Sequence, residues 1–182
     1  MRIITGSEKG RKLMTRKGGN VRPTQDRVRE AIFNMLGAAV VDCTGLDLFA
    51  GFGGLGLEAL SRGADCFTFV EKDRRNCGII KKNIELCGFT DKAILKCSDV
   101  EQYLQSTNQK YDLIFMDPPY QKGYTQQSIS LLLENGIMAG DCLVVSEVGS
   151  REEAPVYSKM EMVRNKEYGD TAVYIYYFKG GK

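Results

Sequence analysis

Histidine and tryptophan are both absent from the 182 residues of this chain. Without histidine the chain cannot use Ser-His or Cys-His nucleophilic catalysis, and it lacks the usual general base near neutral pH. None of the six cysteines stands in a C-x-x-C pair, so a zinc site has little support. We therefore predict small, buried thiols in a reducing cytoplasm.

Long apolar runs are absent too, and no stretch is long enough to span a bilayer. The opening segment, MRIITGSEKGRKL, has no apolar core of the kind that a secretory signal needs. These absences favour a cytoplasmic protein without a membrane partner. With 43% hydrophobic residues, the chain is long enough for one domain and a small appendage.

The net charge of +2 is unevenly distributed along the chain. Residues 1–29 hold nine Lys and Arg against two acidic residues, a net charge of +7, so the remainder carries −5. A basic segment on an acidic body is typical of proteins that bind a polyanion, although a merely solvated surface is the alternative. The candidate RNA-binding residues in this segment are Arg11, Lys12, Arg22, Arg27 and Arg29.

The order of the predicted elements indicates an α/β fold. Residues 2–15 form two short β segments with a turn between them, and residues 23–36 form a helix with Thr24 as a possible cap. From Gly45 onward strands alternate with helices five times, which predicts a parallel, doubly wound sheet. Two strands over residues 161–179 follow without a helix between them, so one of them must run antiparallel. We divide the chain into a basic β arm (residues 1–22) and a main domain (residues 23–182).

A glycine-rich loop follows the first strand of the main domain. It reads Gly51-x-Gly53-x-x-Gly56, and Glu71 ends the next strand, 20 residues after Gly51. Such glycines let the backbone approach a ligand, and an acid at the second strand accepts ribose hydroxyls. The pattern predicts an adenosine-containing cofactor but does not distinguish NAD from S-adenosylmethionine (SAM). The alternative is that the glycines only permit tight packing of strand on helix.

An acidic residue also follows the third strand of the main domain, in CSDV. The carboxylate of Asp99 could accept from an adenine amino group, while the next backbone N–H meets a ring nitrogen. It is equally suited to cap the helix that begins at Val100.

The sequence Asp117-Pro118-Pro119-Tyr120 directly follows the apolar run YDLIF. Two prolines cannot continue a central strand, so a stiff turn leaves these groups at a carboxyl end, where α/β sheets bind ligands. The Asp117 carboxylate and the Pro118 carbonyl can each accept one N–H of a nucleobase amine. Tyr120 can stack on the base, which is worth roughly 1–3 kcal/mol. The alternative is an ordinary end of a strand, with Tyr120 covering the core.

Taken together, RPTQDRVREAIFNML, DLFAGFGGLGLEALSRGA, FVEKD and DLIFMDPPY resemble class I SAM-dependent methyltransferases of the [Asn/Asp/Ser]-Pro-Pro-[Tyr/Phe] type. More narrowly, the chain is similar to the RsmD family, which methylates guanine N2 in bacterial 16S ribosomal RNA. The resemblance covers nearly the whole chain, in order and at matching spacing. It departs at Phe52, where the family often has a small residue, and in the arm, where it often has tryptophan.

This resemblance implies a Rossmann-like sheet of seven strands, mostly parallel with one antiparallel strand, in residues 23–182 as the methyltransferase domain. It implies SAM as methyl donor and a guanine of small-subunit ribosomal RNA, naked or in an assembling 30S subunit, as the target. We also expect no metal and a monomer. The resemblance also implies that Arg22-Pro23-Thr24 lies near the methionine end of SAM. The implied catalytic residues are Asp117, Pro118, Pro119 and Tyr120. The implied cofactor-binding residues are Thr24, Asp47, Phe49, Ala50, Gly51, Gly53, Glu71, Lys72, Asp99 and Val100.

Three other functions stay open at this point. A methyltransferase of adenine N6 in RNA or DNA could use the same Asp-Pro-Pro-Tyr sequence, although the chain has no room for a separate DNA-recognition domain. An NAD-dependent oxidoreductase would use the glycine loop but leave Asp-Pro-Pro-Tyr unexplained. A non-catalytic RNA-binding module would use the basic arm alone, and the intact Asp-Pro-Pro-Tyr sequence counts against it.

Overall fold

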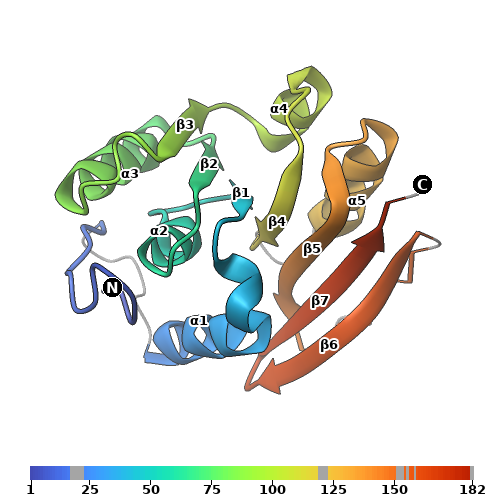
Figure 1. Ribbon diagram of the computed structural model, residues 1–182, viewed down its shortest axis with the longest axis horizontal. Helices are drawn as coiled ribbons and strands as arrows, with labels where there is room; N and C mark the ends of the chain where they lie inside the picture. Colours follow the sequence, from blue (N-terminus) through green and yellow to red (C-terminus); the bar gives the residue numbers. More distant parts are fainter. Residues whose placement is uncertain (17–22, 119–122, 151–153, 155, 158, 181–182) are drawn as a thin grey trace.

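Seven strands form a single sheet in the order β3-β2-β1-β4-β5-β7-β6 (Figure 1). The computed structural model describes residues 1–16, 23–118, 123–150, 154, 156–157 and 159–180, and for residues 23–25 it describes the backbone only. The strands are β1 (Thr44–Leu48), β2 (Cys66–Glu71), β3 (Ala93–Cys97), β4 (Tyr111–Met116), β5 (Met138–Gly149), β6 (Met160–Tyr168) and β7 (Thr171–Lys179).

The helices alternate with the first five strands, as the sequence predicts. They are α1 (Pro23–Leu36), the 3-10 helix η1 (Gly37–Val40), α2 (Gly54–Ser61), α3 (Arg74–Leu86), α4 (Val100–Ser106) and α5 (Tyr124–Glu134). Because α1 begins at Pro23, Thr24 lies in its first turn and not before it, which corrects its expected place as a cap. Among the described residues, no helix combines the length and apolar character that crossing a bilayer requires.

Strands β1 to β5 pair in parallel, and the expected antiparallel strand is confirmed as β7. The sequence did not indicate that β7 would lie inside the sheet, between β5 and β6. Burial explains this order, since most residues of β7 are buried while β6 exposes nearly all of its residues. The apolar strand therefore takes the inner position, and the polar strand forms the edge.

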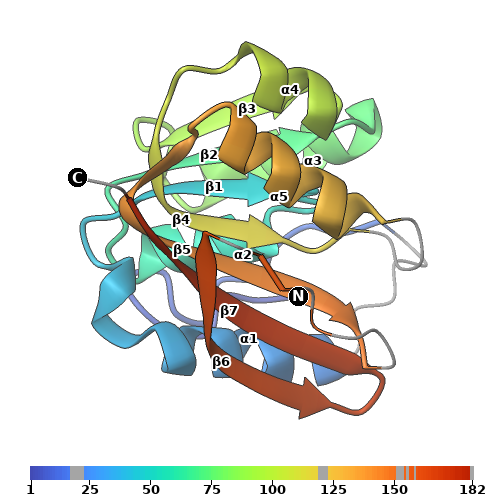
Figure 2. The same cartoon turned by 90° about the vertical axis from the view of Figure 1, so that its right-hand side faces the viewer.

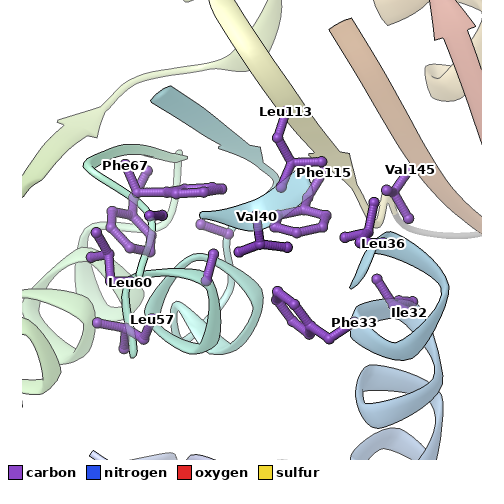
Figure 3. Close-up of a cluster of buried hydrophobic side chains, with 14 of the residues drawn as sticks. Ile32, Phe33, Leu36, Val40, Leu57, Leu60, Phe67, Leu113, Phe115 and Val145 are labelled. Atoms are coloured by element: carbon purple, nitrogen blue, oxygen red, sulfur yellow. The ribbon is translucent and has the colours of Figure 1, made fainter. Parts of the chain in front are cut away.

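Helices cover both faces of the sheet and enclose two apolar clusters. On one face, α1, α2 and α3 bury their side chains together with Phe67 and Phe115, and the Phe33 ring meets Phe115 edge-on (Figure 3). On the other face, α4 and α5 pack around Tyr111. Figure 2 shows α4 and α5 on the opposite side of the sheet from α1. The central strands are thus buried on both faces, as parallel sheets require.

The described part of the basic arm, residues 1–16, folds back on itself as an antiparallel pair with a single bridge between Arg2 and Lys12. Its side chains Ile3 and Leu13 are only 1% and 6% exposed and belong to the same cluster as α1 and α2. The arm therefore contributes to the core as well as to the charged surface.

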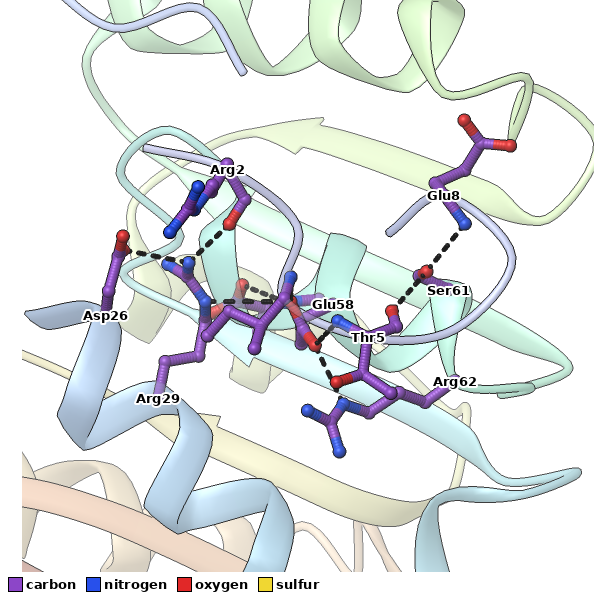
Figure 4. A network of polar contacts seen from close by, with 11 residues as sticks. Arg2, Thr5, Glu8, Asp26, Arg29, Glu58, Ser61 and Arg62 are labelled. Carbon is purple, nitrogen blue, oxygen red and sulfur yellow. Dashed lines mark hydrogen bonds and ion pairs between the residues drawn. The ribbon is translucent and has the colours of Figure 1, made fainter. Parts of the chain in front are cut away.

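Glu58, on α2, anchors the basic arm (Figure 4). Its carboxylate is fully buried and accepts hydrogen bonds from the backbone N–H groups of Ile4 and Thr5, at 2.7 and 3.0 Å. Arg62 donates to the same carboxylate at 2.8 Å, and the Arg29 guanidinium lies 3.8 Å from it. Removing a partner from such a buried charge is strongly destabilising, so these contacts fix the arm to α2.

Two cysteines correct the expectation of free thiols. Cys77 on α3 and Cys97 at the end of β3 are joined by a disulfide, although 20 residues separate them in the sequence. The pairing of β3 with β2 brings the two residues together in space, and no local spacing signals it. The remaining cysteines are free, and all but the half-buried Cys66 are buried.

Candidate active site

The candidate site residues gather at one edge of the sheet, where the parallel strands end. Asp117 follows β4, the glycine loop (residues 49–53) follows β1, Glu71 ends β2 and Asp99 lies two residues beyond β3. Since β1 lies between β2 and β4, the glycine loop lies between Glu71 and Asp117. Doubly wound sheets bind ligands at this edge, at the point where the strand order reverses.

The glycines of this segment are needed for two different reasons. Gly51 and Gly53 have φ values of +58° and +82°, which residues with a side chain rarely adopt. Gly56 permits close packing, because a Cβ there would lie 2.3 Å from the ring of Phe69. Phe49 has φ +61° although it is not a glycine, and such strained backbone is often found at functional sites.

Glu71 holds the glycine loop in position. One carboxylate oxygen accepts from the N–H of Gly51 and the other from the N–H of Asp73, both at 2.8 Å. The residue is only 8% exposed. A carboxylate oxygen has two lone pairs, so each oxygen can accept a ribose hydroxyl in addition to its backbone partner.

Asp47, within β1, lies between the glycine loop and α2. It is 1% exposed, and its carboxylate accepts a hydrogen bond from the N–H of Gly56 at 3.0 Å. Desolvation, together with the nearby charges of Asp117 and Glu71, raises the pKa of Asp47 to about 7. The hydrogen bond from Gly56 lowers this pKa, but by less than the other causes raise it. The site therefore contains several carboxylates close to one another and partly removed from water.

Asp117 directly follows the last residues of β4, and Pro118 after it is buried. Asp117 is exposed where it lines the larger hollow, but the protein atoms around its carboxyl partly desolvate it, which raises its pKa to about 6. At neutral pH Asp117 is ionised and can accept hydrogen bonds, but it takes up a proton more readily than an ordinary aspartate.

Two hollows meet at the glycine loop, and Phe49 lines both. The larger, of about 360 Å³, contains Asp47, Asp117, Glu147 and Arg29 together with backbone of the glycine loop. The smaller, of about 230 Å³, is lined by residues of α4 and α5 and by the segments after β2 and β3. An elongated ligand could therefore extend across Phe49 from one hollow into the other.

The smaller hollow contains four of the residues that the resemblance implied for cofactor binding, namely Phe49, Lys72, Asp99 and Val100. Asp99 caps α4 by accepting from the N–H of Glu101 at 2.9 Å, which confirms the capping interpretation. Its contact with an adenine stays a prediction, and capping does not exclude it.

The structure corrects the placement of Arg29 on a basic surface. The residue is 5% exposed, and it donates to the Arg2 carbonyl at 2.6 Å and to Asp26 at 3.0 Å. The residue is also one of those that line the larger hollow. Arg29 is buried because it lies on α1 where this helix meets the basic arm and α2. The charge pattern of the sequence alone could not reveal this arrangement.

The other basic candidates are in different situations. Arg11, Lys12 and Arg27 are exposed, and Arg11 forms a surface ion pair with Glu8 at 2.8 Å. Arg22, Pro119 and Tyr120 lie outside the described residues, as does the side chain of Thr24.

Glu147, on β5, is a site residue that the sequence interpretation missed. It lines the larger hollow together with Asp117. A signal was present, since Glu147 is the one charged residue in the otherwise apolar or small run CLVVSEV near the carboxyl end of a strand. In the part of the chain that the structure describes, no three acidic or cysteine side chains form a group that could hold a metal ion.

Comparison with known proteins gives a consistent result over the whole chain. A family model described as "Conserved hypothetical protein 95" matches residues 1–177. YlbH of Bacillus subtilis (strain 168) is 38% identical over 184 residues, which cover 99% of this chain and 100% of that protein. Ribosomal RNA small subunit methyltransferase D of Escherichia coli (strain K12) is 36% identical over 177 residues, covering 97% and 89%. The chain belongs to the RsmD family.

The likeness to the RsmD family extends to three dimensions. The solved structure of the Escherichia coli protein yhhF superimposes with a TM-score of 0.92 and 35% identity, covering 100% of this chain and 99% of that one. The match to the family model runs from the basic arm into β7, so it includes every candidate residue named above. The match does not assign roles to these residues, so we infer their roles from the geometry of the two hollows.

Proposed function

We propose that this protein transfers the methyl group of SAM to the exocyclic N2 amine of a guanine in 16S ribosomal RNA. Membership of the RsmD family supports the coarser part of this proposal, SAM-dependent methylation of ribosomal RNA. The observation that carries it is the position of Asp117, which Pro118 directly follows: Asp117 lines the same hollow as the glycine loop, across the point where the strand order reverses. The proposed setting is the cytoplasm, with the protein acting as a monomer on naked RNA or an assembling 30S subunit.

The charges of the larger hollow favour SAM over NAD. Asp47 and Arg29 line it on the side of the glycine loop, and Asp117 and Glu147 add negative charge on the side of β4 and β5. SAM carries a sulfonium and an ammonium group that suit carboxylates, and one carboxylate that suits an arginine. NAD would instead place a doubly negative pyrophosphate beside these acids, which nearby like charges disfavour.

The remaining cofactor contacts follow from the two hollows. Glu71 would accept the ribose hydroxyls while it keeps the N–H of Gly51. Asp99 and the N–H of Val100 would meet the adenine in the smaller hollow, beside Lys72. The backbone of the glycine loop would lie against the methionine portion in the larger hollow.

Asp117 and Pro118 orient the amine that accepts the methyl group. The carboxylate and the carbonyl each accept one N–H, so the nitrogen lone pair is directed toward the cofactor side of the hollow. SAM, when bound, would supply an electrophilic methyl group: as the amine nitrogen bonds to the methyl carbon, the carbon–sulfur bond would break and its electron pair would stay on the sulfur of S-adenosylhomocysteine, which leaves. Fixed orientation and preorganised acceptors are established sources of rate. The surplus amine proton can leave to ionised Asp117 or to water, so no histidine is required.

A two-part experiment tests the proposal. Calorimetry should detect binding of SAM and not of NAD. The protein is then incubated with labelled SAM and either naked 16S RNA or assembling 30S subunits, and the labelled nucleosides are identified after digestion. N2-methylguanosine is the expected product. N6-methyladenosine would support the rival methyltransferase function, and NAD binding or RNA binding without methylation would contradict the proposal.

A further inference from the structure

Glu147 and Asp117 lie side by side at the carboxyl ends of neighbouring strands. In the pairing of β4 with β5, Met116 is opposite Ser146, so the next residues along each strand are Asp117 and Glu147. Neighbouring strands are about 4.8 Å apart. Phe115 and Val145, two residues earlier on each strand, belong to the same apolar cluster, so both acids follow residues that face α1 and α2. Both acids also line the larger hollow.

The strand order separates the cofactor side of the site from the substrate side. The residues proposed to hold SAM follow β3, β2 and β1, which are three consecutive strands of the sheet. The acceptor Asp117 follows β4, the next strand, and Glu147 lies one strand farther, on β5. Glu147 is therefore on the opposite side of Asp117 from the cofactor residues, where the rest of the base ring would lie.

The chemistry of the base then determines what a carboxylate in this position favours. In guanine, the N2 amine is adjacent to N1–H, so two neighbouring ring positions donate hydrogen bonds. In adenine, the N6 amine is adjacent to N1, which is an acceptor. An ionised carboxylate only accepts hydrogen bonds, so it suits guanine N1–H and repels the lone pair of adenine N1.

We propose that Glu147 is a specificity-determining residue that accepts N1–H of the target guanine while Asp117 holds the adjacent N2 amine. This inference rests on the proposed function and explains how a site with Asp-Pro-Pro-Tyr, which suits either amine, selects guanine. Enzymes that act on extruded bases read them by hydrogen bonds to the same edge. In sites built on such hydrogen bonds, kcat/KM for an analogue that lacks the partner group can be 10⁴–10⁵-fold lower.

The test compares two RNA substrates that differ at the nucleotide methylated by the wild-type protein. One contains guanine, and the other contains 2-aminopurine, which keeps the 2-amino group but has an acceptor at N1. Single-turnover methylation by the wild type should be at least about 100-fold faster on guanine. In Glu147→Gln the amide can donate to N1 of 2-aminopurine, so the ratio of the two rates should fall at least about tenfold.

Two further variants keep the test decisive. Glu147→Asp retains the charge but withdraws it by one methylene, so it should slow methylation of guanine without improving 2-aminopurine. Glu161→Gln, on the exposed edge strand β6, is the matched control and should leave the ratio unchanged.

The outcomes distinguish this inference from the proposed function. If the wild type methylates guanine but Glu147→Gln leaves the ratio unchanged, Glu147 does not read the base. The same conclusion holds if the variant only weakens SAM binding. If the wild type transfers methyl groups to adenine or to no base, the proposed function itself is wrong and the inference falls with it.

Discussion

Glu71 has two tasks at the level of single residues, because it holds the glycine loop and faces the expected ribose position. Its two oxygens accept from the backbone on either side, at Gly51 and Asp73. The loop is thereby shaped before any ligand arrives. Preorganisation of this kind reduces the entropy lost on binding, so Glu71 should affect affinity through the loop as well as through direct contact.

Replacing Glu71 tests this assignment. Glu71→Ala should weaken SAM binding about 10- to 100-fold, because hydrogen bonds to a charged group contribute about 1.5–3 kcal/mol. Glu71→Gln keeps one acceptor oxygen, so its SAM affinity should lie between those of Glu71→Ala and the wild type. Affinity is measured by calorimetry, and circular dichroism checks that the fold is intact. Unchanged SAM affinity in Glu71→Ala would remove Glu71 from the cofactor site.

Asp47 should make the stability of the ligand-free protein depend on pH. Its pKa is raised from 3.8 to about 7 in the folded state, mainly by desolvation, so the folded protein holds its proton more tightly than the unfolded chain. Its contribution to the free energy of unfolding is therefore fully present below about pH 4 and is lost as pH rises through about 7.

Asp47→Asn should remove this pH dependence, because the amide stays uncharged and its oxygen can still accept from Gly56. Urea unfolding of the wild type and the variant between pH 5 and pH 8 measures how the free energy of unfolding of each depends on pH. We expect the variant to be the more stable protein at pH 8, with a smaller difference at pH 5. A wild type that is the more stable protein at pH 8 would contradict the raised pKa.

At the level of elements, α2 joins the basic arm to the cofactor loop. Its N-terminus follows Gly53, and Glu58 on the same helix binds the backbone of the arm. Met1 of the arm also lines the larger hollow. The arm therefore supports the shape of the site, which is why removing it would test folding and not RNA binding alone.

Glu58→Gln tests the anchoring of the arm. The amide cannot accept with both of its ends, and it removes the Glu58 charge from the buried guanidinium of Arg29, which then keeps its ion pair with Asp26. Breaking a buried ion pair costs about 3–5 kcal/mol, which chemical denaturation can measure. Glu8→Gln, which breaks a more exposed ion pair with Arg11, should cost about 1 kcal/mol or less. Equal effects of the two substitutions would mean that Glu58 does not anchor the arm.

Elements and strand ends could be predicted from the sequence because their signals are local. The alternation of strands and helices, the glycine loop, Glu71 and Asp117 each depend on a few adjacent residues. The position of β7 inside the sheet and the proximity of Glu147 to Asp117 depend on which strands pair. The burial of Arg29 and the joining of Cys77 to Cys97 likewise depend on contacts between distant segments. No local pattern encodes those contacts.

At the level of the whole molecule, charge is separated between the basic segment and the rest of the chain. Residues 1–29 carry +7 and the remainder −5. Lys9 and Lys12 of the basic arm are exposed, whereas Arg29, which lies on α1 in the same basic segment, lines the larger hollow. The exposed lysines are therefore the better test of RNA affinity.

Lys9→Gln combined with Lys12→Gln should weaken RNA binding and flatten its dependence on salt. Each lost phosphate contact lowers the slope of log affinity against log salt by about 0.7 to 0.9. The matched control combines Lys92→Gln with Lys110→Gln. These exposed lysines directly precede β3 and β4, at the edge of the sheet opposite the candidate active site. Filter binding at several salt concentrations measures both pairs. If the two pairs change the slope equally, the arm has no special part in binding RNA.

The most direct test of the central claim is the single-turnover rate of Asp117→Ala at saturating SAM and RNA. If Asp117 orients the amine for methyl transfer, the rate should fall about 10²–10³-fold, as when one preorganised contact is removed from an active site. SAM affinity should barely change, and Asp117→Asn, which keeps one acceptor, should retain part of the activity. A wild-type rate in Asp117→Ala would contradict the account, because Asp-Pro-Pro-Tyr would then be only the end of a strand.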